Sequence, residues 1–523
     1  MLIDGRTFAE DESLEADLCI IGGGAAGITL ALDFIAQPLR VLVLEAGGLE
    51  YQHEVQDLYH GESVGQTYDV HATRLRFFGG STNHWGGYCR PFEAIGLERR
   101  PWIPYSGWPI RLGDLEPYYR EAARLCQIGS IDLDAHGWAR RLDLATFDFD
   151  QTCPLSNLVY QLSPPTRFGE VYREAFHKAS NVTVCLHSNV TAIRARHDGQ
   201  TVDHLEARSL GGAGFRVHAR CYVLACGGIE NPRLLLASDD VEKGGLGNRH
   251  DLVGRFFMEH GHFNLGKVAL SDAAPDAHFF LDEIPTEGAA RVSAHIGLSA
   301  EVQRDEQIAG AVVQLRSRIP TSAEKSLHTV LGALKLGSLP DDLGLHIRRM
   351  LSDPGTISSM VRRKVAKKLF GSEEIGILAL RSVGEQVPNP DSRVTLGSSR
   401  DALDLPLARL DWRLTEVDRR TLARTGELIA AEFGRLGLGR VQLQQDEAEP
   451  EPIQGGYHHI GTTRMADDPR EGVVDRHCRV HGMGNLYIAG SSVFPASGNG
   501  TPTLTIVALA LRLAQHLKTD VFV

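Results

Sequence analysis

Three glycines near the N-terminus have the spacing of a turn that binds a pyrophosphate. Gly22, Gly24 and Gly27 fit the pattern GxGxxG, with Ala26 between the last two. The first glycine allows a tight turn, the second lets the backbone approach a pyrophosphate at a helix N-terminus, and the third lets helix and strand pack closely. Glu45 lies eighteen residues after Gly27, where a carboxylate accepts hydrogen bonds from a ribose diol. We therefore predict a dinucleotide site, and a glutamate rather than an arginine argues against a 2′-phosphate.

Two short apolar strands and a helix would hold this turn. The first predicted strand is Asp17 to Ile21, the helix is the stretch ITLALDFIA, and the second strand is Val41 to Leu44. Together they make a βαβ unit. Glycine-rich turns also arise for packing alone, and the motif by itself does not separate NAD from FAD.

Further segments along the chain add small, polar and aromatic residues in a fixed order. They are residues 78–87 (FGGSTNHWGG), 106–109 (SGWP), 117–119 (PYY), 222–233 (YVLACGGIENPR), 457–465 (YHHIGTTRM), 473–475 (VVD), 485–495 (NLYIAGSSVFP) and 501–506 (TPTLTI). In this order they resemble the glucose-methanol-choline (GMC) family of FAD-dependent alcohol oxidoreductases over almost the whole chain. The likeness is nearest to the sugar- and glycoside-oxidising, pyranose 2-oxidase-like members. It implies FAD as cofactor and oxidation of an alcohol CH–OH group to a carbonyl.

The resemblance also implies which residues meet the cofactor beyond the glycine turn and Glu45. Residues 222–225 and 485–489 are predicted strands, and open α/β sheets bind ligands at the carboxyl ends of their strands. Thr501 would cap the last helix and Pro502 would begin it, with the positive end of the helix facing the flavin pyrimidine ring. The cofactor residues expected in this way are Gly80, Ser81, Asn83, His84, Trp85, Val190, Cys226, Gly227, Gly490, Ser491, Thr501 and Pro502.

His84 raises the question of a covalent bond to the flavin. In pyranose 2-oxidase a histidine directly before a tryptophan carries the flavin, and His84 before Trp85 has the same spacing. The preceding residues differ, since Thr82 and Asn83 replace the Ser-Thr of that family member. We expect a noncovalent FAD with His84 along the flavin edge, and a covalent link through His84 is the alternative.

Alcohol oxidation needs a base for the hydroxyl proton while FAD takes the hydride. His458 lies in an HxxGT segment that matches the catalytic-histidine motif of the family, and its neighbour His459 must point differently. A second family position, usually His or Asn, is Thr501 here. Threonine can hydrogen-bond a substrate oxygen but cannot exchange a proton near neutral pH. Asn499, two residues earlier, is the alternative for this second role.

These segments predict an α/β fold, α+β overall, with a discontinuous cofactor domain. A Rossmann-like FAD-binding domain is expected from residues 1–95, 165–265 and 452–523. A substrate domain of antiparallel sheet plus helices is expected from residues 96–164 and 266–451.

Two stretches of the expected substrate domain have distinctive patterns. Residues 378–413 alternate between apolar and polar and predict a sheet that roofs the flavin. Residues 322–370 are predicted helices with basic clusters at Arg348–Arg349 and at 362–368 (RRKVAKK). A solvated face is the default interpretation of these clusters, and contact with a membrane surface or a partner is the alternative.

Composition narrows the class of protein. The 523 residues include 54 basic and 66 acidic ones, a net charge of −12, and no basic run suggests a nucleic-acid partner. Eight sparse cysteines without CxxC spacing argue against disulfide scaffolds and against a metal site. The first eighteen residues lack the apolar core of a secretory signal, and no apolar run could span a membrane. We expect a cytoplasmic enzyme.

The expected partners are a small alcohol, neutral or cationic in view of the acidic composition, and an electron acceptor, O₂ or another. A homo-oligomer is left open. Sugars, glycosides and polyol-like alcohols lead as substrates. The alternatives are the same chemistry on a lipid or steroid alcohol, and a non-redox lyase or isomerase that retains its flavin.

Overall fold

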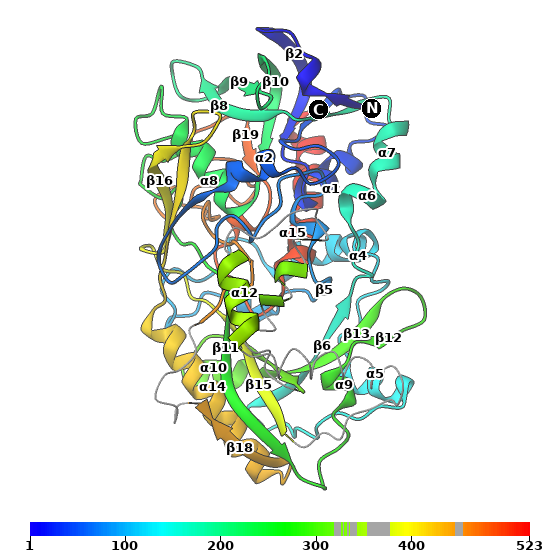
Figure 1. Ribbon diagram of the computed structural model, residues 1–523. Coiled ribbons are helices and arrows are strands. Elements are labelled where there is room, and N and C mark those ends of the chain that lie inside the picture. Colours follow the sequence, from blue (N-terminus) through cyan, green and yellow to red (C-terminus); the bar gives the residue numbers. More distant parts are fainter. Residues whose placement is uncertain (318–325, 328, 332–333, 335–342, 353–376, 445–452) are drawn as a thin grey trace.

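The computed structural model describes residues 1–317, 326–327, 329–331, 334, 343–352, 377–444 and 453–523. In these residues the chain forms two eight-stranded sheets and one three-stranded sheet. The two large sheets occupy opposite ends of the molecule, with α15 (Pro502–His516) running between them (Figure 1). The fold is therefore mixed α/β, as the sequence predicts.

The first large sheet carries the glycine turn. Its order is β1-β7-β3-β2-β10-β9-β8, with β19 beside β10. The pairs among β1, β7, β3, β2, β10 and β19 are parallel, whereas β9 and β8 continue the sheet in antiparallel. β3 and the second half of β2 are buried, which explains their uninterrupted apolar sequence. The strands are β1 Leu2–Asp4, β2 Glu12–Ile21, β3 Val41–Leu44, β7 Val182–Leu186, β8 Asn189–Ala195, β9 Val202–Arg208, β10 Gly214–Leu224 and β19 Leu486–Ile488.

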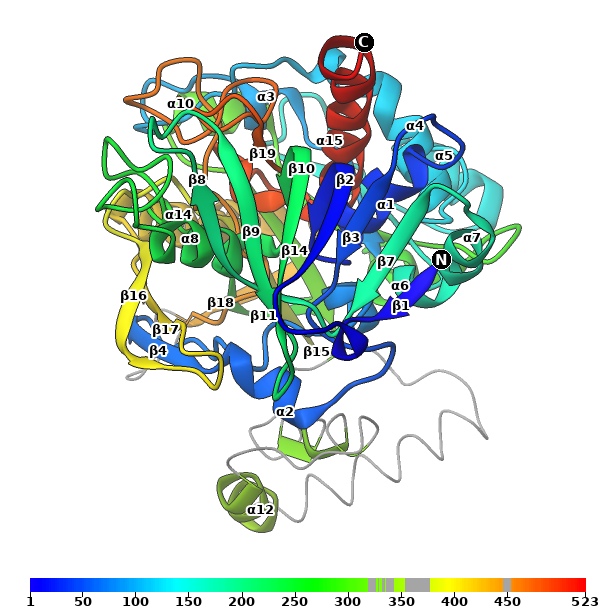
Figure 2. The same ribbon diagram turned by 90° about the horizontal axis from the view of Figure 1, so that it is seen from above.

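Helices α1 (Ala25–Asp33) and α15 pack against each other beside this sheet, and α4 (Glu116–Leu125) packs on α15 (Figure 2). α15 is buried along most of its length, which explains why its sequence is apolar on nearly all sides rather than on one face. Pro502 begins the helix as predicted, and Thr501 occupies the N-cap position. The predicted cap itself is wrong, because the Thr501 hydroxyl donates to the carbonyl oxygen of Tyr88 (2.6 Å) instead of accepting from the helix.

The second large sheet has the order β18-β11-β15-β14-β13-β6-β5, with β12 beside β13, and its pairs are antiparallel. Helix α14 (Glu416–Arg435) packs on this sheet and begins with a capping box formed by Thr415 and Asp418. The strands are β5 Tyr88–Cys89, β6 Leu155–Leu162, β11 His260–Leu270, β12 Ile284–Pro285, β13 Arg291–Leu298, β14 Ala311–Arg316, β15 Ile377–Glu385 and β18 Gly439–Leu443. β5 and the start of β11 come from ranges that the sequence analysis placed with the cofactor domain.

The single sheet predicted over residues 378–413 is divided between two sheets. β15 belongs to the second large sheet, whereas β16 (Arg393–Arg400) and β17 (Pro406–Trp412) pair with β4 (Gly61–Gly65) in the small one. Pro388 and Pro390 separate them, because proline has no backbone N–H to continue a ladder. The remaining helices with α-geometry are α2 His53–Gln56, α3 Ala94–Leu97, α5 Ala135–Leu142, α6 Phe168–Val171, α7 Arg173–Lys178, α8 Gly227–Ala237, α9 His278–Leu281, α10 Ala300–Asp305 and α12 Leu343–Ser352.

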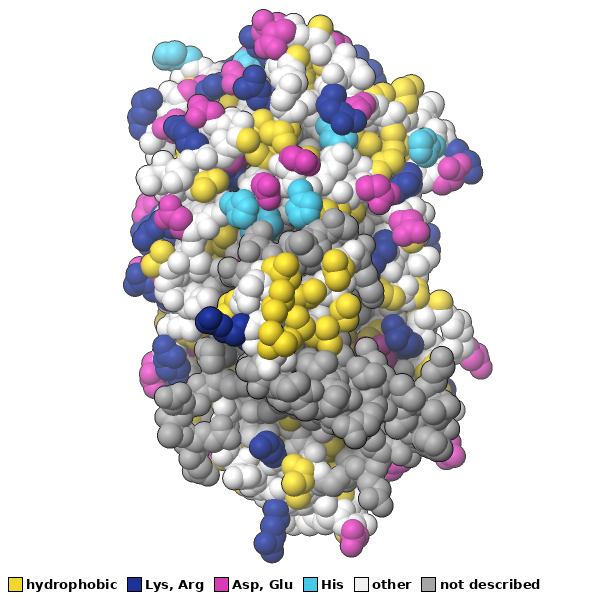
Figure 3. All heavy atoms as spheres, viewed as in Figure 1, with side chains coloured by type: hydrophobic (Ala, Val, Ile, Leu, Met, Phe, Trp, Pro, Cys, Tyr) yellow, Lys and Arg dark blue, Asp and Glu magenta, His cyan; other side chains and the backbone are white. Residues whose placement is uncertain are grey.

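The basic segment predicted over residues 322–370 is described only in part. α12 confirms a helix at Arg348–Arg349, and the cluster at 362–368 lies outside the described residues. Hydrophobic side chains gather on the surface over α12 (Figure 3), where Leu345, Ile347 and Leu351 are exposed. Within the described part of the chain, the helices are too short or too polar to cross a membrane.

Candidate active site

One cavity of about 460 Å³ is lined by residues of both large sheets. On one side it meets the carboxyl ends of β2, β3, β10 and β19, and on the other it meets β11, β14 and β15. Parallel strands end at the same edge of their sheet, which brings residues distant in sequence together there. The predicted cofactor residues that line this cavity are Gly22, Gly24, Ala26, Glu45, Gly80, Ser81, His84, Trp85, Cys226, Gly227, Gly490, Ser491, Thr501 and Pro502.

Each glycine of the N-terminal motif has its own spatial reason. Gly22 has φ +105°, and a Cβ there would lie 2.6 Å from the carbonyl oxygen of Ala225. A Cβ at Gly27 would collide with the carbonyl oxygen of Gly22, so this glycine allows α1 to pack on the turn. A Cβ at Gly24 would meet no atom within 4 Å. Gly24 therefore leaves open the space of the cavity itself, at the N-terminus of α1.

The cavity offers further open space beside the other strand ends. Gly227 follows β10, Gly490 follows β19, and a Cβ at either would also meet no atom within 4 Å. The N-termini of α1 and α15 both reach the cavity without a side-chain cap, so their free N–H groups favour negatively charged groups. These features fit a long ligand with a pyrophosphate at α1 and an anionic ring at α15.

Glu45 is buried at the end of β3 and is held by the backbone. Its Oε2 accepts from the N–H of Gly23 (2.8 Å) and its Oε1 from that of Gly47 (2.9 Å). Burial raises the pKa of this carboxyl, and the two N–H donors partly offset the effect. The carboxylate lines the cavity next to the glycine turn, in a position to accept from a ribose diol.

Three of the predicted cofactor residues do not line this cavity. Gly27 packs against Gly22, and Asn83 donates from Nδ2 to the carbonyl oxygen of Phe78 (3.1 Å). Val190 lines a smaller adjoining cavity of about 70 Å³ together with Gly22 and Glu45. Gly27 and Asn83 therefore support the backbone around the main cavity, and Val190 lines the smaller cavity beside it.

His458 is hydrogen-bonded to a second histidine that the sequence analysis did not single out. Its Nδ1 lies 2.7 Å from Nδ1 of His260, whose Nε2 lies 2.8 Å from the carbonyl oxygen of Gly498 and 3.3 Å from that of Ser497. Within the described residues, Nε2 of His458 has no protein partner, and His458 lines the cavity. Burial, and then the neighbouring histidines, lower the pKa of His458 well below its usual value.

Glu259 holds the backbone around this pair. This buried carboxylate accepts from the N–H groups of Gly456 (2.9 Å), His458 (2.9 Å) and His260 (3.0 Å), and from the hydroxyl of Tyr68. Burial raises the pKa of Glu259 to about 7, against the effect of these donors. One side chain therefore connects the start of β11 to the His458 loop.

The other predicted catalytic residues line the same cavity with different neighbours. The ring of His459 lies against Tyr68 (5.7 Å between centroids), and burial lowers its pKa to about 3. Asn499 donates from Nδ2 to Glu93 Oε2 (3.3 Å), and its carbonyl oxygen accepts from the hydroxyl of Tyr160 (2.9 Å). The two adjacent histidines thus point differently, as expected.

Two family models of flavin-dependent enzymes match parts of the chain. Residues 388–510 match the family model described as GMC oxidoreductase, and residues 17–243 match that of the FAD dependent oxidoreductases. The C-terminal part of the chain thus matches the GMC oxidoreductases, and the N-terminal part matches the FAD dependent oxidoreductases. The protein is therefore an FAD-dependent enzyme that acts on CH–OH donors, and the glycine cradle, the two helix ends and Glu45 fit that cofactor.

Relatives of this enzyme match most of its length. A 6'''-hydroxyparomomycin C oxidase of Streptomyces lividus is 25% identical over 96% of the chain and 92% of the relative. A C-glycoside 3-oxidase of Microbacterium trichothecenolyticum is 26% identical over 85% of the chain and 75% of the relative. The crystal structure of a formate oxidase has the same fold, with a TM-score of 0.57 and 17% identity over 98% of this chain and 100% of that one.

The cavity residues that the sequence analysis missed include two histidines and two arginines. His260 and His262 lie on β11, Arg316 ends β14, and Arg381 lies on β15. One signal was available, because a His-x-His pair in a strand places both side chains on one face. The arginines gave no local signal, since only the pairing of β14 with β15 brings them together.

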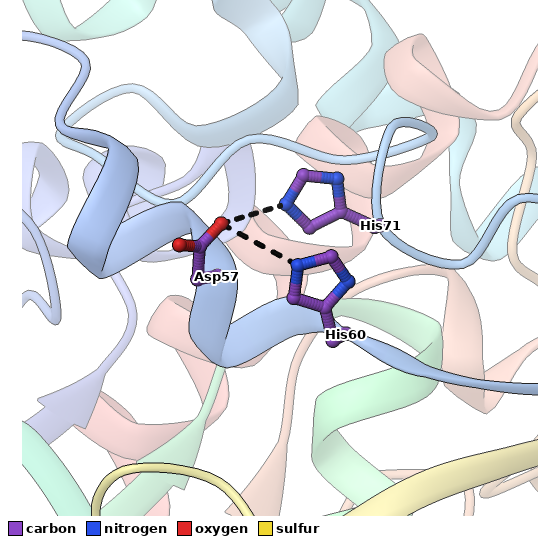
Figure 4. A group of neighbouring side chains, drawn as sticks. All are labelled: Asp57, His60 and His71. Atoms are coloured by element: carbon purple, nitrogen blue, oxygen red, sulfur yellow. Dashed lines mark ion pairs between the residues drawn. The ribbon is translucent and has the colours of Figure 1, made fainter. Parts of the chain in front are cut away.

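The sequence analysis predicted no metal site, and the structure brings two groups of metal-ligating residue types together. They are Asp57 with His60 and His71, and Asp203 with His204 and His218, in each of which the ligand atoms lie within 4.8 Å of one another. In the first group the imidazole rings stack in parallel, 4.2 Å apart, with their Nε2 atoms 3.5 and 3.6 Å from Oδ1 of Asp57 (Figure 4). The lone pair of an imidazole nitrogen lies in its ring plane, so two parallel rings do not aim at one ion. The group is a histidine stack that shares one carboxylate.

Proposed function

We propose that this enzyme oxidises a hydroxyl-bearing carbon of a sugar, glycoside or similar polyol-like alcohol to a carbonyl, with His458 as the base. The observation that carries the proposal is the contact between His458 and His260. Because this contact uses Nδ1 of His458, Nε2 is left to face the cavity. The same contact determines whether Nε2 carries a proton.

The protonation states follow from the hydrogen-bond network. Carbonyl oxygens only accept, so Nε2 of His260 carries a hydrogen toward Gly498 and Ser497. Burial lowers the pKa of His260, and a neutral ring with a hydrogen on Nε2 has an accepting Nδ1. Nδ1 of His458 is therefore the donor in the 2.7 Å contact. Neutral His458 then has an unprotonated Nε2, the atom that faces the cavity.

In the reaction, Nε2 of His458 takes the hydroxyl proton while the carbon-bound hydride leaves, so the alcohol loses two electrons and two protons. FAD supplies the hydride acceptor when bound. Nδ1 of His458 keeps its hydrogen bond to His260 before and after proton transfer, which orients the ring. The Thr501 hydroxyl has its hydrogen committed to Tyr88, so toward the substrate it acts as an acceptor, for a hydroxyl other than the one that donates to His458. His260 and Thr501 are thus positioning residues in this proposal.

A polyol-like substrate is supported by the cavity and by the relatives. Tyr88, Tyr160, Gln314 and Asn499 add polar groups to the wall near His458, and a few placed polar groups fix the orientation of a bound small molecule. The C-glycoside 3-oxidase bears the name of a sugar derivative. A lipid or steroid alcohol would favour a more apolar wall.

Anaerobic mixing of the holoenzyme with candidate alcohols tests the proposal. Bleaching of the flavin by a sugar or polyol supports redox chemistry on that class, and re-oxidation by air identifies an oxidase. We expect His458→Ala to lose at least about 10² in the rate of flavin reduction while retaining FAD. His459→Ala, the matched control, should lose much less. Reduction at the wild-type rate in His458→Ala would place the base elsewhere, and absence of bleaching by every alcohol would favour a non-redox role.

We further propose noncovalent FAD, a cytoplasmic location, and transfer of electrons to O₂ or another acceptor. Burial lowers the pKa of His84, which lines the cavity, to about 4, so the unmodified ring is neutral near physiological pH. The domain boundaries are proposed as the sequence analysis placed them. Cell fractionation tests the location.

A further inference from the structure

Two arginines lie on neighbouring strands in the wall of the cavity near the proposed base. β14 and β15 pair in antiparallel, with Gln314 opposite Arg381 and Arg316 opposite Ala379. Alternate residues of a strand share a face, so Gln314, Arg316 and Arg381 all face the cavity. The strand pairing thus places two guanidinium groups on one patch of its wall.

This patch is connected to His458 through β11. His260, which contacts His458, and His262 both line the cavity, and Nδ1 of His262 lies 2.7 Å from Nη2 of Arg381. Two residues along a strand span roughly 7 Å, and of this pair on β11 His260 contacts the base while His262 contacts Arg381. His262 is neutral, because burial, followed by Arg381, His260 and Arg316, lowers its pKa to about 3.

The charge of Arg316 is not neutralised by a carboxylate among the described residues. Its Nη2 donates to Oε1 of Gln314 (2.6 Å), a neutral group. Two buried arginines outside the cavity differ, because Arg233 pairs with Asp401 (2.6 Å) and Arg100 pairs with Glu385. Arg74, which also lines the cavity, pairs with Glu230 (2.6 Å).

Carboxylates are scarce along the described wall of the cavity. Glu45, beside the glycine turn, is the single carboxylate among the described residues that line the cavity. Charges at the outer surface are screened over about 8 Å at physiological ionic strength. The charges that line the cavity, rather than the net charge of −12, therefore determine the electrostatic potential at a substrate bound next to His458.

We propose that the alcohol substrate carries an anionic oxygen group, a carboxylate or a phosphate, that binds Arg316 and Arg381 while its hydroxyl lies at Nε2 of His458. This inference rests on the proposed function and names its substrate class, an acidic sugar or sugar phosphate. The planar guanidinium matches both anions through paired hydrogen bonds. An ammonium group at the same place is repelled, so the expectation of a neutral or cationic substrate is replaced by an anionic one.

A matched series of sugars tests the inference. Glucose, glucuronate, glucose 6-phosphate and 6-amino-6-deoxyglucose differ only in the group at carbon 6, and the galactose and mannose series extend the comparison. Anaerobic flavin reduction gives an apparent dissociation constant for each. We expect an anionic member to bind roughly 10- to 100-fold more tightly than its neutral parent, and the amino sugar to bind most weakly. Preference for carboxylate over phosphate identifies the source of the anion.

Two substitutions separate this site from a general charge effect. Arg316→Gln removes a guanidinium from the cavity, whereas Arg440→Gln removes an exposed one from β18 of the same sheet. Arg316→Gln should lose most of the preference for the anion, and its remaining preference should depend less on salt. Arg440→Gln should keep the wild-type preference. FAD content and thermal unfolding of both variants verify the fold.

The outcomes distinguish this inference from the proposed function. Equal reduction by neutral and anionic sugars would overturn the anion site and leave alcohol oxidation intact. An anion preference that Arg316→Gln retains in full would also overturn it. Absence of reduction by every sugar would overturn the proposed function and this inference with it.

Discussion

The Nδ1 atoms of His260 and His458 lie 2.7 Å apart, and the far nitrogen of His260 faces two backbone carbonyl oxygens. A contact between two like atoms requires one to donate and the other to accept, and the carbonyls decide which does so. The assignment of hydrogens is inferred from this network. It gives each ring a single tautomer and leaves His458 with a free acceptor in the cavity.

His260 should therefore affect the chemical step without touching the substrate. His260→Ala removes the acceptor for Nδ1 of His458, so both tautomers become accessible, and we expect a rate of flavin reduction between those of wild type and His458→Ala. His260→Asn supplies an amide oxygen near the former Nδ1 and should recover part of the loss. Equal rates for the Ala and Asn variants would reject the tautomer argument.

The pH profile provides an independent measurement of the same pair. The base works when neutral, so the reduction rate rises with pH through the pKa of His458, which burial holds well below 6.5. In wild type the rate should be level above pH 6.5 and decline only in more acidic solution. In His260→Ala, where the ring is less desolvated, the acidic limb should move up toward pH 6.5. A wild-type limb above pH 7 would contradict this environment.

Gly24 should control cofactor retention through space alone. A side chain at this position enters the cavity at the N-terminus of α1, so Gly24→Val should purify without yellow colour. Gly434 of α14, where a Cβ also meets no atom within 4 Å, provides the control. Gly434→Val should remain yellow, with a stability change within about 1 kcal/mol. A Gly24→Val protein that binds FAD normally would exclude the proposed pyrophosphate position.

The attachment of FAD can be read from an acid precipitate. With noncovalent FAD the flavin should appear in the supernatant, and His84→Ala should behave in the same way. Yellow colour that stays in the wild-type pellet but not in the His84→Ala pellet would establish the covalent alternative. Colour in both pellets would exclude His84 as the point of attachment.

His295 should make the fold sensitive to acid. It is 3% exposed on β13, and burial, followed by Arg316 and Arg90, lowers its pKa to about 3. An unfolded histidine has a pKa of about 6.5, so between pH 6.5 and 3 the unfolded chain binds the extra proton. The free energy of unfolding therefore falls with decreasing pH, by up to about 1.4 kcal/mol per pH unit for this group.

Replacing His295 with Phe removes this proton-linked loss. The decline in Tm between pH 7 and pH 5 should be smaller in His295→Phe than in wild type. His278→Gln, at an exposed histidine of α9, should leave the decline unchanged. A His295→Phe variant with the wild-type pH dependence would show that this ring gains no proton on unfolding.

The sequence by itself determined the parts of the site that depend on neighbours along the chain. The turn from Gly22 to Gly27, the strand ending before Glu45 and the start of the last helix at Pro502 all follow from local spacing and backbone restrictions. The resemblance to the GMC family, carried by ordered motifs, gave FAD and alcohol oxidation, which the comparisons confirm.

Only the tertiary structure decided which side chains act together across the cavity. His260 meets His458 from 198 positions away, and Arg316 lies near Arg381 because β14 pairs with β15, although the two strands are far apart in the sequence. The Thr501 hydroxyl, a predicted cap, instead donates to Tyr88, 413 positions away. Such partners are set by sheet pairing and burial, which bring distant residues within hydrogen-bond distance and leave no pattern in the local sequence.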